Sequence, residues 1–219
     1  MRLIRASDHS VLIVFGDAIS PDLHRQVMRM QQALRLPGVL NLHPAYASLL
    51  VSFDPLKTSH EAIEAAALEA ESHEAIAPES LLVEIPVCYG GEFGPDLEEV
   101  AKLVGLTADG VIAAHSEAEY KVYFLGFAPG FPYLGGLPPA LAVPRLPQPR
   151  LRVPAGSVAL GGGQTGVYPM STPGGWRLIG RTPLCLFDPG AARPTLLEIG
   201  DRVKFRRIAA HDYERLSRG

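Results

Sequence analysis

The residues best suited to chemistry in this chain lie within residues 120–188, a segment dense in glycine, proline and aromatic side chains. It opens with YKVYFLGFAPGFPYLGGLP and closes with LGGGQTGVYPMSTPGGWRLIGRTPLCLFDP. This composition predicts tight turns between short strands, where the backbone can approach a ligand or a partner closely. It is also typical of a small barrel whose hairpins need glycine and proline only to turn.

Residues 126–138 contain no charged side chain. Prolines stiffen this stretch, and Phe127, Phe131 and Tyr133 supply flat apolar surface with one hydroxyl group. Trp176, the single tryptophan, is either a core anchor or a residue that orients a ligand through its indole N–H. We interpret these four residues as a rigid groove for a small ligand or a partner segment.

Three arginines, Arg145, Arg150 and Arg152, follow the aromatic residues in a proline-rich run. Guanidinium groups bind carboxylates and phosphates through paired hydrogen bonds, so the trio could form an anion site. Each arginine alone is more typical of a solvated loop. The glycines at 161–163 could present backbone N–H groups to an oxyanion, but a hairpin is favoured because the lysine of a P-loop is missing.

His115 lies at the predicted end of a helix that leads into the glycine-rich segment. A histidine at this position could act as a general acid or base, since the pKa of an unperturbed histidine lies near neutrality. It could equally cap the helix, because the helix dipole favours a protonated ring at the C-terminal end. Spacing alone leaves both roles open.

Bulk composition limits the partners. The formal net charge is −3 in 219 residues, so no basic excess favours a nucleic acid. The apolar run near the N-terminus is too short to cross a membrane and no signal-peptide pattern follows it, so we expect a cytoplasmic protein without a membrane partner. Cys88 and Cys185 indicate reduced thiols, and no metal site is predicted.

Two domains of an α+β protein are expected to position these residues. In residues 1–88, strands at 9–15, 39–43, 47–53 and 81–87 alternate with helices at 21–36 and 59–72. This βαββαβ order predicts a ferredoxin-like domain with both helices on one face of an antiparallel sheet. Residues 89–219 form the second domain, with two capped helices before the strand that begins at Tyr120.

Four motifs in order carry a family resemblance: IPVCYGGEFGPDLEEVA, His115 with YKVYFLGFAPGFPYLGGL, VPAGSVALGGGQTGVYP and STPGGWRLIGRTPLCLFDP. Over residues 2–212 the chain resembles the family of the B subunit of 5-oxoprolinase, the sporulation-kinase inhibitor of bacilli and proteins called allophanate hydrolase subunit 1. It is also similar to subdomains C and D of the carboxyltransferase domain of urea carboxylase. The resemblance implies a C-terminal cyclophilin-like β-barrel.

The resemblance also implies a function. In this family the B subunit pairs with a homologous C subunit. Together with the A subunit they form a complex that cleaves 5-oxo-L-proline to L-glutamate using ATP and Mg²⁺. The B and C pair phosphorylates the lactam before ring opening, and the isolated subunit is expected to be inactive. Allophanate hydrolysis is disfavoured, because the Ser-Ser-Lys signature of an amidase is missing from the sequence.

Matching the motif positions assigns the site residues. His115 is expected to be catalytic, and the substrate-binding set is Tyr89, Arg152, Gln164 and Arg181. Replacing His115 or Arg181 by alanine should then lower turnover more than about tenfold while the fold stays intact. In the alternative function, the aromatic groove binds a sensor histidine kinase and inhibits it without catalysis.

Overall fold

The computed structural model describes residues 1–71 and 80–218. The chain divides into two compact units, Met1–Pro78 and Glu79–Gly219, and each unit contains a hydrophobic core of its own. The predicted α+β class is confirmed. Both cysteines are free thiols. Among the helices of the described ranges, none has the length and apolar character that crossing a membrane requires.

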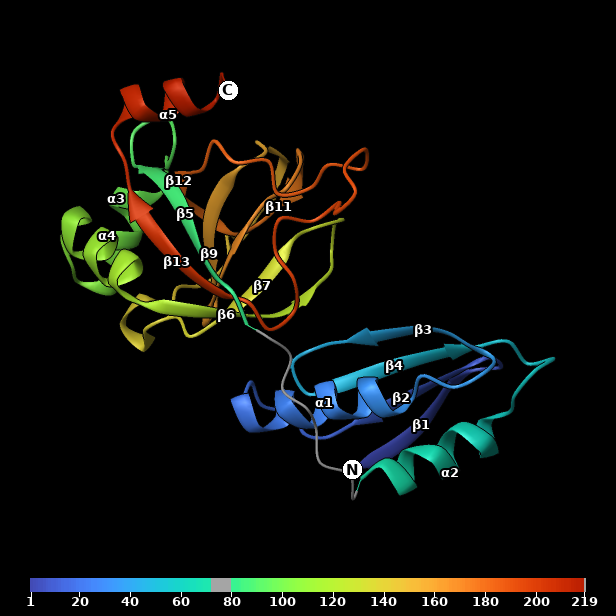
Figure 1. Ribbon diagram of the computed structural model, residues 1–219. Helices are drawn as coiled ribbons and strands as arrows, with labels where there is room; N and C mark the ends of the chain where they lie inside the picture. Colours follow the sequence, from blue (N-terminus) through green and yellow to red (C-terminus); the bar gives the residue numbers. More distant parts are fainter. Residues whose placement is uncertain (72–79, 219) are drawn as a thin grey trace. The chain divides into compact units, whose positions relative to one another are not determined.

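The first unit is a four-stranded antiparallel sheet with two helices packed on one face (Figure 1). Its strands are β1 (Arg2–Ser7), β2 (Ser10–Val14), β3 (Val39–Pro44) and β4 (Ser48–Phe53), in the order β1-β2-β4-β3. Helices α1 (Pro21–Ala33) and α2 (His60–Ala70) begin after Ser20 and Ser59, whose hydroxyls accept backbone N–H groups of the first turn. The predicted end of the second helix at Ser72 lies outside the described residues.

The order of elements in this unit is ββαββα, which differs from the predicted βαββαβ. Strand β1 was not predicted because five of its six residues are exposed, so no alternation of apolar residues marks it. Arg5 in this strand instead pairs with Glu61 and Glu64 of α2. Charged residues are common on such edge strands, where they discourage pairing with other chains.

The strand predicted at 81–87 belongs to the second unit. As β5 (Leu82–Tyr89), it pairs in parallel with β13 (Arg202–Arg207) and antiparallel with β12 (Arg177–Arg181). The boundary between the units therefore falls between residues 78 and 79 and not after residue 88. An apolar strand can join either sheet, and its partners here lie about ninety to one hundred and twenty residues further along the chain.

The second unit is built on a closed barrel with the strand order β10-β7-β6-β13-β5-β12-β9 (Figure 1). This confirms the β-barrel that the family resemblance implies for the C-terminal part. The remaining barrel strands are β6 (Glu119–Leu125), β7 (Pro132–Gly135), β9 (Ser157–Gly161) and β10 (Gln164–Val167). A separate pair is formed by β8 (Arg150–Val153) and β11 (Thr172–Gly174), and the helical segments are α3 (Leu97–Val104), α4 (Ala108–Glu117), η1 (Pro139–Leu141) and α5 (Ala210–Leu216).

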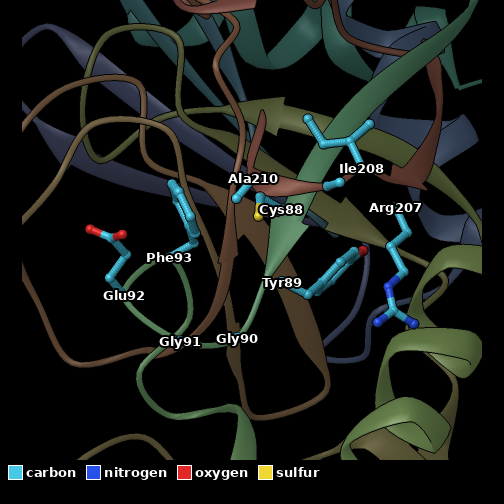
Figure 2. Close-up of a pocket in the computed structure, with 10 residues that line it drawn as sticks. Cys88, Tyr89, Gly90, Gly91, Glu92, Phe93, Arg207, Ile208 and Ala210 are labelled. Atoms are coloured by element: carbon cyan, nitrogen blue, oxygen red, sulfur yellow. The ribbon is translucent and has the colours of Figure 1, made fainter. Parts of the chain in front are cut away.

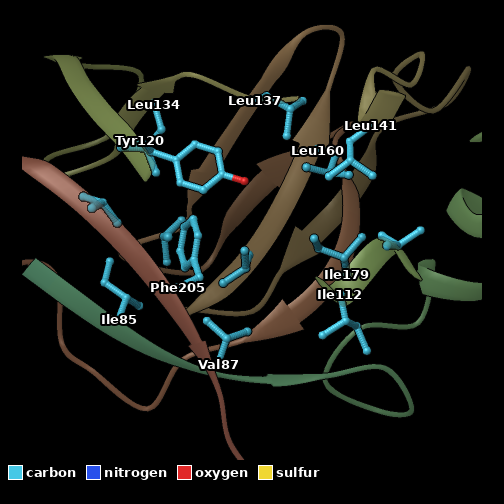
Figure 3. Packing of buried hydrophobic residues seen from close by; sticks show 14 of the residues in the cluster. Ile85, Val87, Ile112, Tyr120, Leu134, Leu137, Leu141, Leu160, Ile179 and Phe205 are labelled. Carbon is cyan, nitrogen blue, oxygen red and sulfur yellow. The ribbon is translucent and has the colours of Figure 1, made fainter. Parts of the chain in front are cut away.

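Apolar side chains fill the barrel (Figure 3). Tyr120 and Phe205 supply the largest rings, and α4 adds Ile112 to the same cluster. Because these residues are nearly or fully buried, the barrel interior is a packed core and not an open channel. A binding site must therefore lie at an end of the barrel or on its outer surface.

Candidate functional site

His115 lies inside the barrel core. Its side chain, on α4, has 0% exposed surface. Nδ1 lies 2.8 Å from the Tyr89 hydroxyl and Nε2 lies 3.0 Å from the Thr165 hydroxyl. The ring also stacks on Phe205 with 4.5 Å between centroids. Both ring nitrogens therefore have a hydrogen-bond partner within the protein.

Thr165 determines which nitrogen of His115 carries the hydrogen. The Thr165 hydroxyl donates to the Ala159 carbonyl oxygen at 3.1 Å, so it accepts the hydrogen on His115 Nε2. Nδ1 is then the acceptor for the Tyr89 hydroxyl. Burial lowers the pKa of His115 to about 3 and raises the pKa of Tyr89, which keeps both groups neutral at neutral pH.

This environment corrects both roles considered for His115. A fully buried ring with both nitrogens bonded exposes no atom to a substrate, and a neutral ring is not the protonated helix cap. Within the described residues, His115 is linked to a pocket by its hydrogen bond to Tyr89, which lines that pocket. We therefore expect His115 to influence a ligand in that pocket only through Tyr89.

A pocket of about 610 Å³ opens where β5 ends. We call it the Tyr89 pocket; it is lined by residues 88–93 and 207–210. Figure 2 shows Glu92 and Phe93 on one side of the pocket and Arg207 on the other. Arg207 already pairs with Asp109 at 2.8 Å, and Glu92 adds a negative charge. This pocket therefore has no excess positive charge to attract a polyanion.

The four predicted substrate-binding residues lie on four different strands, of which β5 and β12, with Tyr89 and Arg181, are paired. Of the four, Tyr89 lines the Tyr89 pocket. Arg181 donates from Nε to the Ala155 carbonyl oxygen at 2.7 Å, and Arg152 donates from Nε to the Ser171 hydroxyl at 3.0 Å. Gln164 faces out of the barrel, because side chains alternate along β10 and the next residue, Thr165, points inward. The binding roles of these residues stay predictions.

The four aromatic residues predicted to form a groove do meet, at a second pocket of about 180 Å³. We call it the aromatic pocket; its rings are Phe127, Phe131, Tyr133, Tyr168 and Trp176. Phe131 is central, since the other four rings lie edge-on to it at 5.1 to 5.7 Å between centroids. Tyr168 was not predicted, although it stands in the same glycine-rich segment.

Glycines in the barrel wall let these rings lie directly on the strands. A Cβ atom at Gly161 would lie 2.7 Å from the Trp176 ring, and one at Gly166 would lie 2.9 Å from Phe131. Such distances are far below van der Waals contact, so a larger residue would displace the rings. The run LGGGQTG is thus a β9–β10 hairpin, as favoured from the sequence, and its first and last glycines, Gly161 and Gly166, accommodate aromatic rings.

The three arginines predicted as an anion site are separated in the structure. Arg150 pairs at 2.6 Å with the buried Asp96, whose other oxygen accepts the Leu178 N–H at 2.7 Å. Arg152 is held by Ser171. Arg145 alone lines the aromatic pocket, with its guanidinium carbon 5.7 Å from the centre of the Trp176 ring. The trio therefore does not act as one site.

Phe127 stands in this pocket in a strained conformation. Its φ is +67°, a value that no other non-glycine residue shows in the described ranges. The Ala128 N–H bonds to the Gly126 carbonyl oxygen at 2.8 Å across it, which closes a γ-turn. The positive-φ form of this turn is rare and strained for a residue with a side chain. The ring is nevertheless 63% exposed, so core packing alone does not account for it.

Glycine at position 127 should relieve this strain. We expect Phe127→Gly to be more stable than Phe127→Ala by about 1 kcal/mol, because both lack the ring and only glycine adopts a positive φ freely. Urea unfolding followed by Trp176 fluorescence measures the difference. An alanine variant as stable as the glycine variant would contradict the strain.

Comparison with known proteins relates these features to a family. The family model described as carboxyltransferase domain, subdomain C and D, matches residues 1–197. A relative from Bacillus subtilis (strain 168), named as the B subunit of 5-oxoprolinase, is 46% identical over 221 residues. That match covers 94% of this chain and 92% of the relative.

Solved structures agree with this match. The crystal structure of TTHA0988 is 38% identical with a TM-score of 0.81 over 92% of this chain, which spans only 40% of that protein. The urea carboxylase of Kluyveromyces lactis shares the fold, with a TM-score of 0.80 at 20% identity over 97% of this chain and 22% of its own. On its sequence and fold, the chain belongs to the family of the carboxyltransferase domain, subdomains C and D.

Proposed function

We propose that this chain is the B subunit of an ATP-dependent 5-oxoprolinase, in which it acts with the A subunit of the enzyme and with a homologous C subunit. The observation that carries the proposal is the 46% identity, along nearly the whole chain, to a relative of that name. The name of that relative identifies it as a subunit of an enzyme. The chemical step and the partners are our proposal for this chain.

In the proposed reaction, the B and C subunits transfer the γ-phosphoryl group of ATP to the lactam oxygen of 5-oxo-L-proline. The P–O bond to ADP breaks and a new P–O bond activates the lactam carbon. Two water molecules then account for ring opening and for release of the phosphate. The products are L-glutamate, ADP and inorganic phosphate.

The described residues form no metal cage of their own, although a magnesium nucleotide needs only one or two carboxylates from a protein. Within residues 1–71 and 80–218, no group of three or more His, Cys, Asp or Glu side chains could hold a metal ion. The Tyr89 pocket has balanced charge, and the aromatic pocket, at about 180 Å³, is smaller than the roughly 300 Å³ at which sites for drug-sized ligands begin. We therefore assign no step of the phosphoryl transfer to a residue of this chain.

Reconstitution tests the proposal. With the A and C subunits verified as folded and associated, the mixture should convert 5-oxo-L-proline to L-glutamate with one ADP formed per glutamate. Omitting this chain should stop both products. A verified complex without turnover would contradict the proposal. If the chain then inhibited phosphorylation of a sensor histidine kinase, the non-enzymatic alternative would gain support.

A further inference from the structure

We propose that the aromatic pocket binds the substrate ring, with Arg145 as the partner of the substrate carboxylate. For the identity of the ligand, 5-oxo-L-proline, this inference rests on the proposed function. The pocket by itself points to a chemical class: a single small ring that carries one carboxylate.

The size and walls of the pocket select a small flat molecule. Its volume of about 180 Å³ lies below the roughly 300–1,000 Å³ typical of drug-sized ligands, so one ring with one substituent suits it better than a nucleotide. Phe131, Tyr168 and Trp176 are nearly buried and hold one another by edge-to-face contacts. The walls are thus already ordered, which reduces the entropy that binding would cost.

The charge in the pocket selects an anion. Arg145 is the one charged residue among those that line the pocket, and no acidic side chain pairs with it in the described ranges. The arginines next to it in space or sequence differ: Arg150 is paired with Asp96, and Arg177 with Glu99 at 2.8 Å. A guanidinium held over an indole ring keeps its N–H groups for a carboxylate, which it can bind through two hydrogen bonds.

Tyr168 offers a neutral donor beside this charge. Its hydroxyl is neutral because burial raises its pKa, and its hydrogen can be donated to a ligand. A Cβ atom at Gly174, which also lines the pocket, would lie 2.3 Å from that hydroxyl oxygen, so the hydroxyl packs directly against the Gly174 backbone and a side chain there would displace it. A lactam carbonyl oxygen is an acceptor of the matching kind.

The strained Phe127 is an independent sign of function. Backbone conformations of this cost persist where the surrounding structure needs them, and they cluster at ligand-binding sites. Here the strain keeps a largely exposed aromatic ring edge-on to Phe131 and Tyr168 in the wall of the pocket. A closing aromatic wall for a small ring would explain why this conformation is kept.

Trp176 makes the binding measurable in the full chain, because it is the only tryptophan. Titration with 5-oxo-L-proline should change its fluorescence in a saturable way. Arg145→Gln should weaken the apparent affinity more than about tenfold, the usual loss for a charged hydrogen-bond pair. Arg193→Gln is the matched control, since that exposed arginine pairs with Glu198 and should leave the titration unchanged.

Two analogues separate the contributions of the ligand. Pyrrolidin-2-one keeps the lactam and lacks the carboxylate, so it should bind the wild-type chain and the Arg145→Gln variant equally weakly. Cyclopentanecarboxylate keeps the ring and the carboxylate, so its binding should still depend on Arg145. An Arg145→Gln effect of the same size for pyrrolidin-2-one would overturn the assignment of Arg145 to the carboxylate.

The reconstituted complex separates this inference from the proposed function. Turnover with a KM for 5-oxo-L-proline that Arg145→Gln and Phe127→Ala leave unchanged, and no fluorescence change in the chain, would overturn the site and leave the function standing. Arg145-dependent binding of cyclic carboxylates without turnover in a verified complex would support the site and contradict the function. A KM raised more than about tenfold by Arg145→Gln, but not by Arg193→Gln, would support both.

Discussion

Replacing His115 by alanine should lower the free energy of unfolding of the barrel unit by about 3–5 kcal/mol. The substitution removes a ring that is 0% exposed and leaves a cavity beside Phe205. It also leaves the Tyr89 hydroxyl without its His115 partner, whereas the Thr165 hydroxyl keeps its bond to the Ala159 carbonyl oxygen. The unpaired Tyr89 hydroxyl adds about 1–3 kcal/mol to the cost of the cavity.

Urea unfolding followed by Trp176 fluorescence measures this effect in the correct unit, since Trp176 lies in Glu79–Gly219. His211→Ala is the matched control, because His211 is an exposed histidine of the same unit and should change stability by no more than about 0.5 kcal/mol.

This result would replace the expectation that His115→Ala leaves the fold intact and lowers only turnover. The opposite outcome is equally clear. A variant with an unchanged urea midpoint and a more than about tenfold loss of turnover in the complex would contradict the buried placement of His115 and support a direct catalytic role. The placement in the core would then not describe the working enzyme.

The barrel unit should also lose stability in acid because of the same ring. Burial lowers the pKa of His115 to about 3 in the folded chain, against the ordinary value of 6.5. Between these values the unfolded chain binds one proton more than the folded chain. The contribution of His115 is therefore complete above about pH 6.5 and falls by about 1.4 kcal/mol per pH unit as the pH drops toward 3.

A variant without a titrating group at position 115 separates the contribution of His115 to the pH dependence from that of the carboxylates. Between pH 6.5 and 5, His115 should account for about 2 kcal/mol of lost stability. His115→Phe retains a ring and has no titrating group. The pH slope of its unfolding free energy should therefore be smaller by the equivalent of one bound proton, about 1.4 kcal/mol per pH unit. His115→Gln provides a second non-titrating chain. Equal pH dependence in the wild-type chain and both variants would contradict a neutral buried His115.

Part of the candidate site was predicted and part was not. The four aromatic residues of the groove do line one pocket. Three of them belong to a stiff, uncharged segment, and its rings are stabilised by packing on the barrel wall. Arg145 was grouped with two arginines that the structure holds elsewhere. The substrate-binding set taken from motif positions lies on four different strands, because a motif orders residues along the chain and not around a barrel.

The sequence by itself determined local structure, such as helix starts, and the family to which the chain belongs. Hydroxyls of Ser20, Ser59 and Thr107 cap helices by bonding N–H groups two or three residues away, so these helix starts depend on their nearest neighbours. Four long motifs were enough to identify the family. Neither inference needs contacts between distant segments.

What only the tertiary structure decided depends on partners far along the chain. Strand β5 joins the barrel because β13 pairs with it, and His115 is buried because Phe205 and Thr165 close around it. Burial then makes the ring neutral and leaves no part of it exposed to a substrate. The protonation state of a histidine depends on its exposure to solvent and on neighbouring groups, and spacing along the chain predicts neither.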